Sequence, residues 1–111
     1  MSNLIKYSST RGGESSLSYE DVLLSGLARD GGLFMPEEWP QFSHSDLNEM
    51  KHLNYAELSA KIIKPFVEPC LSENELLNIS KDTYSVFNKD VAPLYQLNKN
   101  LHVLELFYGP T

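Results

Sequence analysis

The chain has 111 residues, which suits one domain, and 41% of them are apolar, enough to bury a core and to argue against global disorder. The formal net charge is −6, and the nine Lys and Arg residues are scattered rather than gathered in a basic patch. This charge pattern argues against nucleic acid as a partner and against electrostatic binding to a membrane.

The sequence contains no run near the roughly 20 apolar residues that span a bilayer, and its first residues do not resemble a signal peptide. The single cysteine, Cys70, favours a reducing compartment, so we expect a cytoplasmic protein. Cys70 has no base beside it in sequence and is expected to be a small packing residue. His44, His52 and His102 lack metal-ligand spacing, so no metal site is expected.

The first elements are short. Residues 4–8 are predicted to form a strand, and the polar, glycine-bearing stretch 9–16 is predicted to form a loop. Ser18 and Asp21 have the spacing of a capping box, and the apolar residues after them lie on one helical face. This pattern predicts a helix that runs to about Leu27.

A turn and an irregular stretch follow that helix. Residues 29–32, Arg-Asp-Gly-Gly, form a strong turn signal. The apolar stretch 33–35 is stopped by Pro36, and the two prolines within residues 36–42 predict an irregular segment.

Two helices are predicted in the middle of the chain. Ser43 and Asp46 form a second capping pair, which predicts a short helix after them. Asn54 can cap a longer helix, and Pro65 and Pro69 are expected to mark its end.

A fourth helix is predicted after Ser72 and Glu75, which form the clearest capping box in the chain. One apolar stripe is expected along this helix. Its members are Leu76, Ile79, Thr83 and Phe87.

The last part of the chain is extended in character. Residues 93–97 predict a short extended segment, and residues 101–107, Leu-His-Val-Leu-Glu-Leu-Phe, predict a buried strand. Glu105 inside that run is either a water-facing edge residue or a buried acid with a partner. The predicted fold class is α+β: about four helices with one short mixed or antiparallel sheet that includes the N-terminal strand and the 101–107 strand.

Residues 109–111, Gly-Pro-Thr, look like the opening of a helix, because proline is favoured in a first helical turn. A buried strand that leads straight to the last residues is unusual for a natural terminus. We therefore expect that the chain is a truncated part of a longer protein.

Three regions together resemble the start of threonine synthase. The first comprises residues 7–12 and 17–22, the second is residues 25–36, and the third is residues 101–111, ending Phe-Tyr-Gly-Pro-Thr. The order and spacing of these regions match that family across essentially the whole chain. The resemblance implies that residues 1–111 are the N-terminal domain of a threonine synthase.

The resemblance also implies a chemistry. Threonine synthases are fold-type-II pyridoxal-phosphate enzymes that convert O-phospho-L-homoserine and water into L-threonine and phosphate. Their cofactor lysine follows closely after the Gly-Pro-Thr motif, and so would lie beyond Thr111. On this reading the chain alone is inactive, binds no cofactor and depends on the missing catalytic domains of the same enzyme.

No lysine of this chain is predicted to serve as a reactive amine, because none lies in an apolar or glycine-bounded setting that would depress its pKa. Each is expected to be a solvated surface residue. They are Lys6, Lys51, Lys61, Lys64, Lys81, Lys89 and Lys99.

Two groups of residues are candidates for a place near substrate or cofactor. Arg11 is adjacent to a glycine pair and could reach a substrate phosphate, and the backbone N–H groups of Gly31 and Gly32 could bind an anion. The alternatives are a solvated loop arginine and a plain turn between helix and strand. The resemblance implies a second group near the cofactor, which consists of Tyr108, Gly109, Pro110 and Thr111.

Tyr108 departs from the family pattern, since many members have histidine at this position. Tyrosine keeps a hydrogen-bonding tip on an aromatic ring but does not titrate near neutral pH. A packing or positioning role for Tyr108 survives this change, whereas a proton-transfer role is put in doubt.

Three functions remain open at this stage. The first is a catalytically silent domain of a threonine synthase. The second is an autonomous interaction module that uses the apolar 101–107 strand to pair with another chain, including a second copy of itself. The third is a domain of a threonine-synthase-like phospho-lyase with a different amino-acid substrate.

Overall fold

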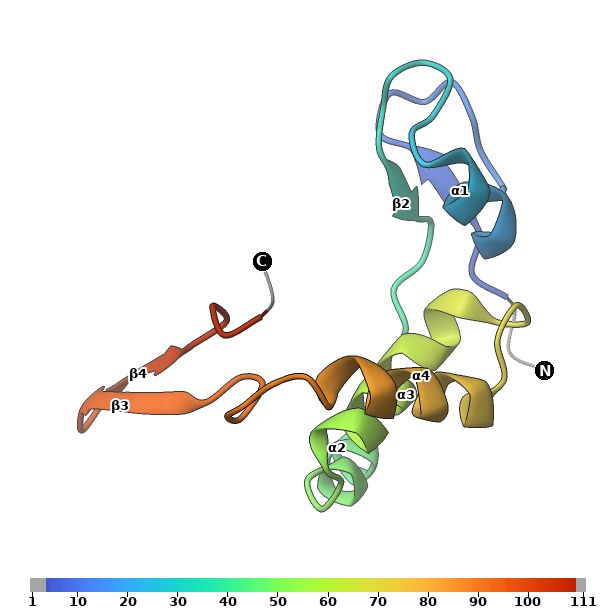
Figure 1. Ribbon diagram of the computed structural model, residues 1–111. Helices are drawn as coiled ribbons and strands as arrows, with labels where there is room; N and C mark the ends of the chain where they lie inside the picture. Colours follow the sequence, from blue (N-terminus) through green and yellow to red (C-terminus); the bar gives the residue numbers. More distant parts are fainter. Residues whose placement is uncertain (1–3, 110–111) are drawn as a thin grey trace.

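The computed structural model describes residues 4–109, and in it two arms extend from a helical body (Figure 1). The radius of gyration is 16.6 Å, whereas a compact chain of about 100 residues has a value of roughly 13 Å. The radius of gyration is larger because the two arms extend away from the helical body. The fold is α+β, with four helices and two separate antiparallel strand pairs among the described residues.

The N-terminal arm contains β1 (Tyr7–Ser9), α1 (Tyr19–Ser25) and β2 (Phe34–Pro36). Strands β1 and β2 pair antiparallel. Helix α1 begins after Ser18, whose side chain accepts a hydrogen bond from the Asp21 N–H, as the capping pair predicted. The helix ends at Gly26, which has a φ of 73°. A left-handed residue cannot continue a right-handed helix, so α1 stops short of the predicted Leu27.

The body is formed by α2 (His44–Met50), α3 (Tyr55–Val67) and α4 (Glu73–Tyr84). All three predicted starts are confirmed, because each helix has a complete capping box in which cap and third helical residue exchange hydrogen bonds. Helices α3 and α4 pack side by side (Figure 1). Local side-chain chemistry therefore fixes where the body helices begin.

The end of α3 lies between Pro65 and Pro69, as predicted: Pro65 is inside the helix, and the helix runs on to Val67. Pro65 lacks a backbone donor, but the helix continues past it to its cap, where the Glu68 N–H donates to the Lys64 carbonyl (3.2 Å). Glu68 is extended, with φ −62° and ψ 143°. Because the residue before a proline avoids the helical region, it is Pro69 that ends the helix.

The core is small and lies between α3 and α4. Ala60, Val67 and Leu76 form its buried cluster, and four partly buried side chains pack against it. Those four are Tyr19, Phe66, Leu71 and Leu77.

The predicted stripe on α4 is only partly correct. Leu76 is buried and is followed one turn later by buried Ser80, whereas Ile79 is 50% exposed and Thr83 is exposed. Phe87 lies beyond the end of the helix. Helix α4 buries the face that carries Leu76 and Ser80, because α3 packs on that side. The hydrophobic pattern of α4 alone does not indicate on which side α3 lies.

Aromatic residues join the N-terminal arm to the body. The Tyr7 hydroxyl donates a hydrogen bond to the Phe66 carbonyl at the end of α3. The Tyr7 ring lies 6.3 Å from Tyr19, and Trp39 meets Phe66 edge-on at 6.0 Å. Burial, and to a smaller extent Tyr19, raise the pKa of Tyr7. The Tyr7 phenol therefore stays protonated and keeps donating its bond at neutral pH.

The C-terminal arm is a hairpin of β3 (Leu94–Asn98) and β4 (Leu101–Leu104), with Leu94 opposite Leu104 and a bulge between Gln96 and Asn98. The predicted buried strand over 101–107 is wrong, because β4 ends at Leu104 and every residue of both strands is exposed. The single sheet is also wrong, since β1 pairs with β2 and the hairpin stands apart (Figure 1). The apolar pattern is that of a covered strand, but no element of the described chain covers it.

Candidate functional site

The Asp30 carboxylate organises the tip of the N-terminal arm. Its Oδ1 accepts hydrogen bonds from the Ser9 hydroxyl (2.7 Å) and the Gly32 N–H (2.9 Å), and its Oδ2 accepts one from the Gly13 N–H (2.8 Å). The Ser9 bond is the leading cause that lowers the pKa of Asp30, followed by the Gly32 bond, with smaller contributions from Gly13 and Arg11. Asp30 is therefore ionised at neutral pH and draws the turn and the preceding loop together.

Glycines make this close approach possible. A Cβ on Gly32 would lie 2.2 Å from the Ser9 Oγ, and a Cβ on Gly13 would lie 2.5 Å from the Asp30 Oδ2. Both distances are far inside van der Waals contact, and the two oxygens belong to the hydrogen-bonded cluster itself. Close packing therefore requires glycine at both positions, which the sequence pattern did not show.

Arg11 is held against the same turn. Its backbone N–H donates to the Ser9 Oγ (3.1 Å), and its Nη1 donates to the Asp30 carbonyl (3.0 Å). Gly31, with a φ of 81°, is so near that a Cβ there would lie 2.8 Å from the Arg11 Nη1. The structure therefore brings three predicted residues, Arg11, Gly31 and Gly32, into one cluster.

The N–H groups of the glycine pair already have partners in this cluster. Gly31 donates to the Ala28 carbonyl (2.9 Å), and Gly32 donates to Asp30. Both N–H groups thus serve the turn in this structure, and anion binding by the pair stays a prediction. The Arg11 side chain is exposed at this tip, and its contact with a substrate phosphate stays a prediction.

A second clamp holds the loop between β1 and α1. The Glu37 carboxylate accepts hydrogen bonds from the Ser8 hydroxyl and from the Ser16 N–H (2.7 Å). These bonds, led by that of Ser8, lower the pKa of Glu37. Ser16 has a φ of 57°, which is uncommon for a residue with a side chain, and the Glu37 bond helps to hold it there.

The predicted residues at the other end of the chain lie in a different place. Tyr108 and Gly109 face the segment that follows α4, where they line a hollow of about 440 Å³ together with residues 86–89. Pro110 and Thr111 lie outside the described residues. Figure 1 shows the end of β4 and the tip of the N-terminal arm well apart, so the chain does not unite its two candidate groups.

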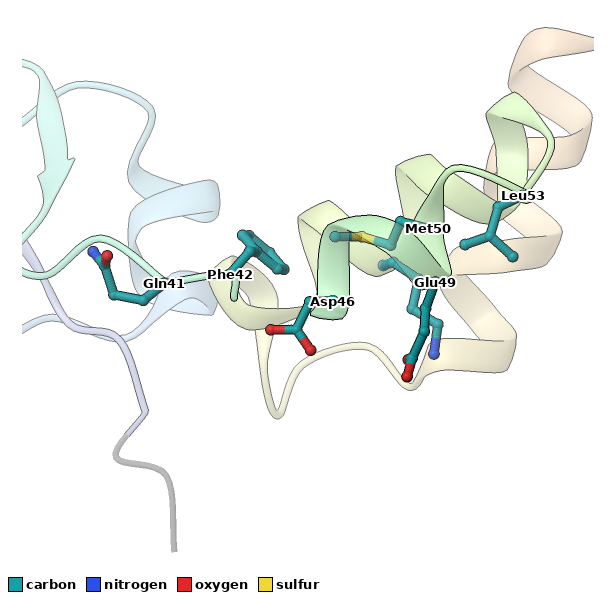
Figure 2. Close-up of a pocket in the computed structure, with 7 residues that line it drawn as sticks. Gln41, Phe42, Asp46, Glu49, Met50 and Leu53 are labelled. Carbon is teal, nitrogen blue, oxygen red and sulfur yellow. The ribbon is translucent and has the colours of Figure 1, made fainter. Parts of the chain in front are cut away.

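A second hollow, of about 420 Å³, lies beside α2 and α3 (Figure 2). Asp46 at its edge accepts the Ser43 N–H (2.7 Å), which lowers the pKa of Asp46. Lys61 forms an ion pair with Glu73 (2.8 Å), and this pair raises the pKa of Lys61. These two charged groups already serve the helix cap and the packing of α3 on α4, so the hollow has a structural explanation.

The remaining sequence candidates show surface roles. Cys70 is exposed, so its expected packing role is wrong: the turn that follows α3 turns it outward. His102 is exposed on β4 opposite Gln96, and Glu105 is half-buried just after the strand, its N–H bonded to the Pro93 carbonyl (2.9 Å). Residues 4–109 contain no cluster of three or more His, Cys, Asp or Glu placed to hold a metal ion.

Most lysines are exposed as predicted, and the exception is Lys64, which is half-buried between Glu68 (3.6 Å) and Glu73 (3.5 Å). Two residues were missed as organisers of candidate sites. The sequence pattern marks Asp30 only as part of a turn and Lys89 only as a surface lysine. An acid directly before a Gly-Gly pair is a signal for the first, whereas the second has no local signal.

No helix among the described residues is long and apolar enough to cross a membrane. What the fold does present is a small helical domain with an uncovered apolar arm, the pattern of one part of a larger protein.

The comparisons identify that protein class. A pyridoxal-phosphate-bound threonine synthase from Brucella melitensis superposes with a TM-score of 0.87 and 39% identity, over 96% of this chain and 23% of that one. The family described as threonine synthase N terminus matches residues 6–84. The chain belongs to this family.

Two relatives illustrate the similarity in sequence. A threonine synthase from Pseudomonas aeruginosa is 47% identical over 96% of this chain and 23% of its own length. The human protein named threonine synthase-like 2 is 38% identical over 95% of this chain and 22% of its own length. The chain therefore spans about a quarter of the length of the relatives it matches.

Proposed function

We propose that this chain is the N-terminal domain of a threonine synthase and that it serves by docking against the catalytic part of that enzyme. The parent enzyme would convert O-phospho-L-homoserine and water into L-threonine and phosphate in the cytoplasm. Family membership and the 47% identity to the Pseudomonas enzyme support this assignment.

The observation that carries the docking role is the uncovered apolar hairpin. Leu94, Tyr95, Leu101 and Leu104 are each more than half exposed, and Phe107 just beyond β4 is 67% exposed. Large apolar side chains gathered on one exposed arm mark a surface that another body covers. About three quarters of the length of the Pseudomonas relative lies outside the matched region, which is ample chain to cover it.

The cofactor does not fit the described residues. A Schiff-base lysine needs an amine that can lose its proton, yet the lysines within residues 4–109 are exposed or paired with carboxylates, and the pairing raises the pKa of Lys61. In this proposal the pyridoxal phosphate and its lysine belong to the rest of the enzyme. This domain contributes docking surface, and it would bring Arg11, at the tip of the N-terminal arm, and Tyr108 and Gly109, after the hairpin, near substrate and cofactor.

A chimera tests the proposal. The matching N-terminal region of the Pseudomonas enzyme is replaced with residues 1–111, and threonine formation from O-phospho-L-homoserine is measured. We expect activity within about tenfold of the parent enzyme, since the domains are homologous in fold. A folded, cofactor-loaded chimera that made no threonine would contradict the assignment.

Hairpin substitutions test the docking role in the same chimera. Replacing Leu94 and Leu104 with serine is expected to lower activity about tenfold or more, because burying each leucine contributes roughly 2 kcal/mol. Leu47→Ser, on α2 and 52% exposed, is the matched control and should leave activity near the unsubstituted value. Equal effects of the hairpin and control changes would overturn the docking role.

Two further readings are tested by the same material. Similarity to human threonine synthase-like 2 favours, as the second candidate, a related phospho-lyase with a different amino-acid substrate. A parent protein that released phosphate from another phosphorylated amino acid and formed no threonine from O-phospho-L-homoserine would select it. We also propose that the isolated chain self-associates through the hairpin. Size-exclusion chromatography should then show an apparent mass that rises with concentration, and the Leu94 and Leu104 serine variant should remain monomeric.

Asp30 provides a prediction about pH. Its lowered pKa means that the folded state binds a proton there less readily than the unfolded chain, whose value is near 3.8. Its stabilisation is thus present above about pH 3.8 and is lost as the pH falls through the lower folded-state pKa.

The Asp30→Asn variant should be less stable than the parent at neutral pH and should lose less stability on acidification. Urea midpoints at about pH 7 and about pH 2.5 measure both effects. Asp90→Asn, an exposed acid between α4 and β3, is the control. Parallel acid curves for the parent and Asp30→Asn would contradict the role of this carboxylate.

A further inference from the structure

The hollow between residues 86–89 and Tyr108–Gly109 is framed by aromatic contacts that begin in the body. The Tyr55 ring on α3 meets Tyr84 on α4 edge-on at 4.8 Å, and Tyr84 lies 6.0 Å from Phe87. Gly109 approaches the far end of the Phe87 ring, since a Cβ there would lie 3.8 Å from Phe87 Cζ. A line of rings therefore connects the helical body to the segment after β4.

Lys89 adds a second contact to the same segment. Its Nζ lies 5.3 Å from the centroid of the Tyr108 ring, within the roughly 6 Å over which a cation is attracted to an aromatic face. Phe107 lies 4.8 Å from the Tyr108 ring. Tyr108 is half-buried between these neighbours, whereas Lys89 is exposed, so the ammonium covers a ring that otherwise would meet water.

These contacts decide where the chain goes after the hairpin. The Glu105 N–H still donates to the Pro93 carbonyl (2.9 Å), but residues 106–109 have no regular secondary structure, so strand pairing does not hold them. The segment turns back into the space between the hairpin and the N-terminal arm (Figure 1). Phe87 and Lys89, in the segment after α4, contact the last described residues, Gly109 and Tyr108.

We propose that Lys89 is a positioning residue that acts through Tyr108: the ammonium on the ring face fixes the Tyr108–Gly109 backbone against Phe87. This inference rests on the proposed function, in which Tyr108 and Gly109 lie near the substrate and cofactor of the parent enzyme. Lys89 itself touches neither. Its effect is to hold the backbone in one geometry at the entrance to the catalytic part.

The contact is tested first in the chain itself. In NMR spectra the side-chain methylene protons of Lys89 should be shifted upfield by the ring current of Tyr108. The Tyr108→Leu variant should abolish that shift, whereas the methylene protons of Lys99, in the β3–β4 turn, should not respond. Lys89 resonances at random-coil positions in the parent chain would overturn the contact.

The functional consequence is tested in the active chimera. Lys89→Met keeps the length of the side chain and removes its charge, and it should lower kcat/KM roughly two- to fivefold, the range of an exposed cation–aromatic pair. The loss should fall on kcat, because Lys89 does not contact substrate. Lys89→Arg keeps a cation for the ring and should restore the rate, and Lys99→Met is the control.

The proposed function and the positioning role of Lys89 can be refuted separately. An unsubstituted chimera without threonine synthesis would refute the proposed function and leave the NMR result standing as the test of the contact. An active chimera in which Lys89→Met equals Lys99→Met, or in which Lys89→Arg is no better than Lys89→Met, would refute the positioning role alone. Equal thermal midpoints for the two Met variants would show that the loss of rate is not a loss of folding.

Discussion

Replacing Gly32 with alanine is expected to destabilise the chain by about 3 kcal/mol, because the new methyl group meets a hydrogen-bonded cluster that has no space for it. Gly32 is buried, and a Cβ there would lie 2.2 Å from the Ser9 Oγ and 3.0 Å from the Asp30 Oδ1. The atoms that would have to move, the Ser9 Oγ and the Asp30 Oδ1, are hydrogen-bonded to each other. Either the turn shifts or the Ser9–Asp30 hydrogen bond breaks, and both loosen the tip that carries Arg11.

Urea unfolding measures the loss, and hydrogen exchange locates it at the Gly13 and Gly32 amides, which should lose protection first. Gly26→Ala is the control: apart from its chain neighbours, no atom would lie within 4 Å of a Cβ there, but its φ is 73°. It should therefore show only the strain of a side chain at positive φ, about 1–2 kcal/mol. If Gly32→Ala proved no worse than Gly26→Ala, the cluster would be looser than its geometry indicates.

Leu76→Ala is expected to cost a similar amount, about 3 kcal/mol, because Leu76 is 4% exposed and lies in the core cluster with Ala60 and Val67. Few other side chains are buried between α3 and α4. No neighbouring side chain can therefore fill the cavity that the substitution leaves. At roughly 5 °C per kcal/mol for a chain of this size, the thermal midpoint should fall by about 15 °C.

Ile79→Ala distinguishes the observed packing from the predicted stripe. Ile79 is on the same helix and has the same side-chain volume as Leu76, but it is 50% exposed. Its loss should be about 1 kcal/mol or less. Equal losses at the two positions, measured by the same thermal and urea unfolding, would show that α4 faces α3 along the stripe the sequence suggested.

The candidate site was only partly accessible from sequence. The structure brings the predicted residues Arg11, Gly31 and Gly32 together, and the reason they meet is Asp30, whose carbonyl binds Arg11 and whose carboxylate binds Gly32. Their place near substrate or cofactor stays a prediction. A turn tetrad indicates where a chain reverses and not which loop lies across it. Likewise Lys89 is nineteen positions before Tyr108, and no local pattern indicates that they meet.

By itself the sequence determined the starts of the helices, the extended character of the two ends and the family. Capping is a contact between residues three positions apart, so the short-range pattern contains all of it, as at Ser72 with Glu75. The tertiary structure alone decided which face of α4 is buried, that Pro65 stays inside α3, and that the hairpin stands uncovered. Those outcomes depend on which bodies lie beside an element, and burial is a property of neighbours that a one-dimensional pattern does not contain.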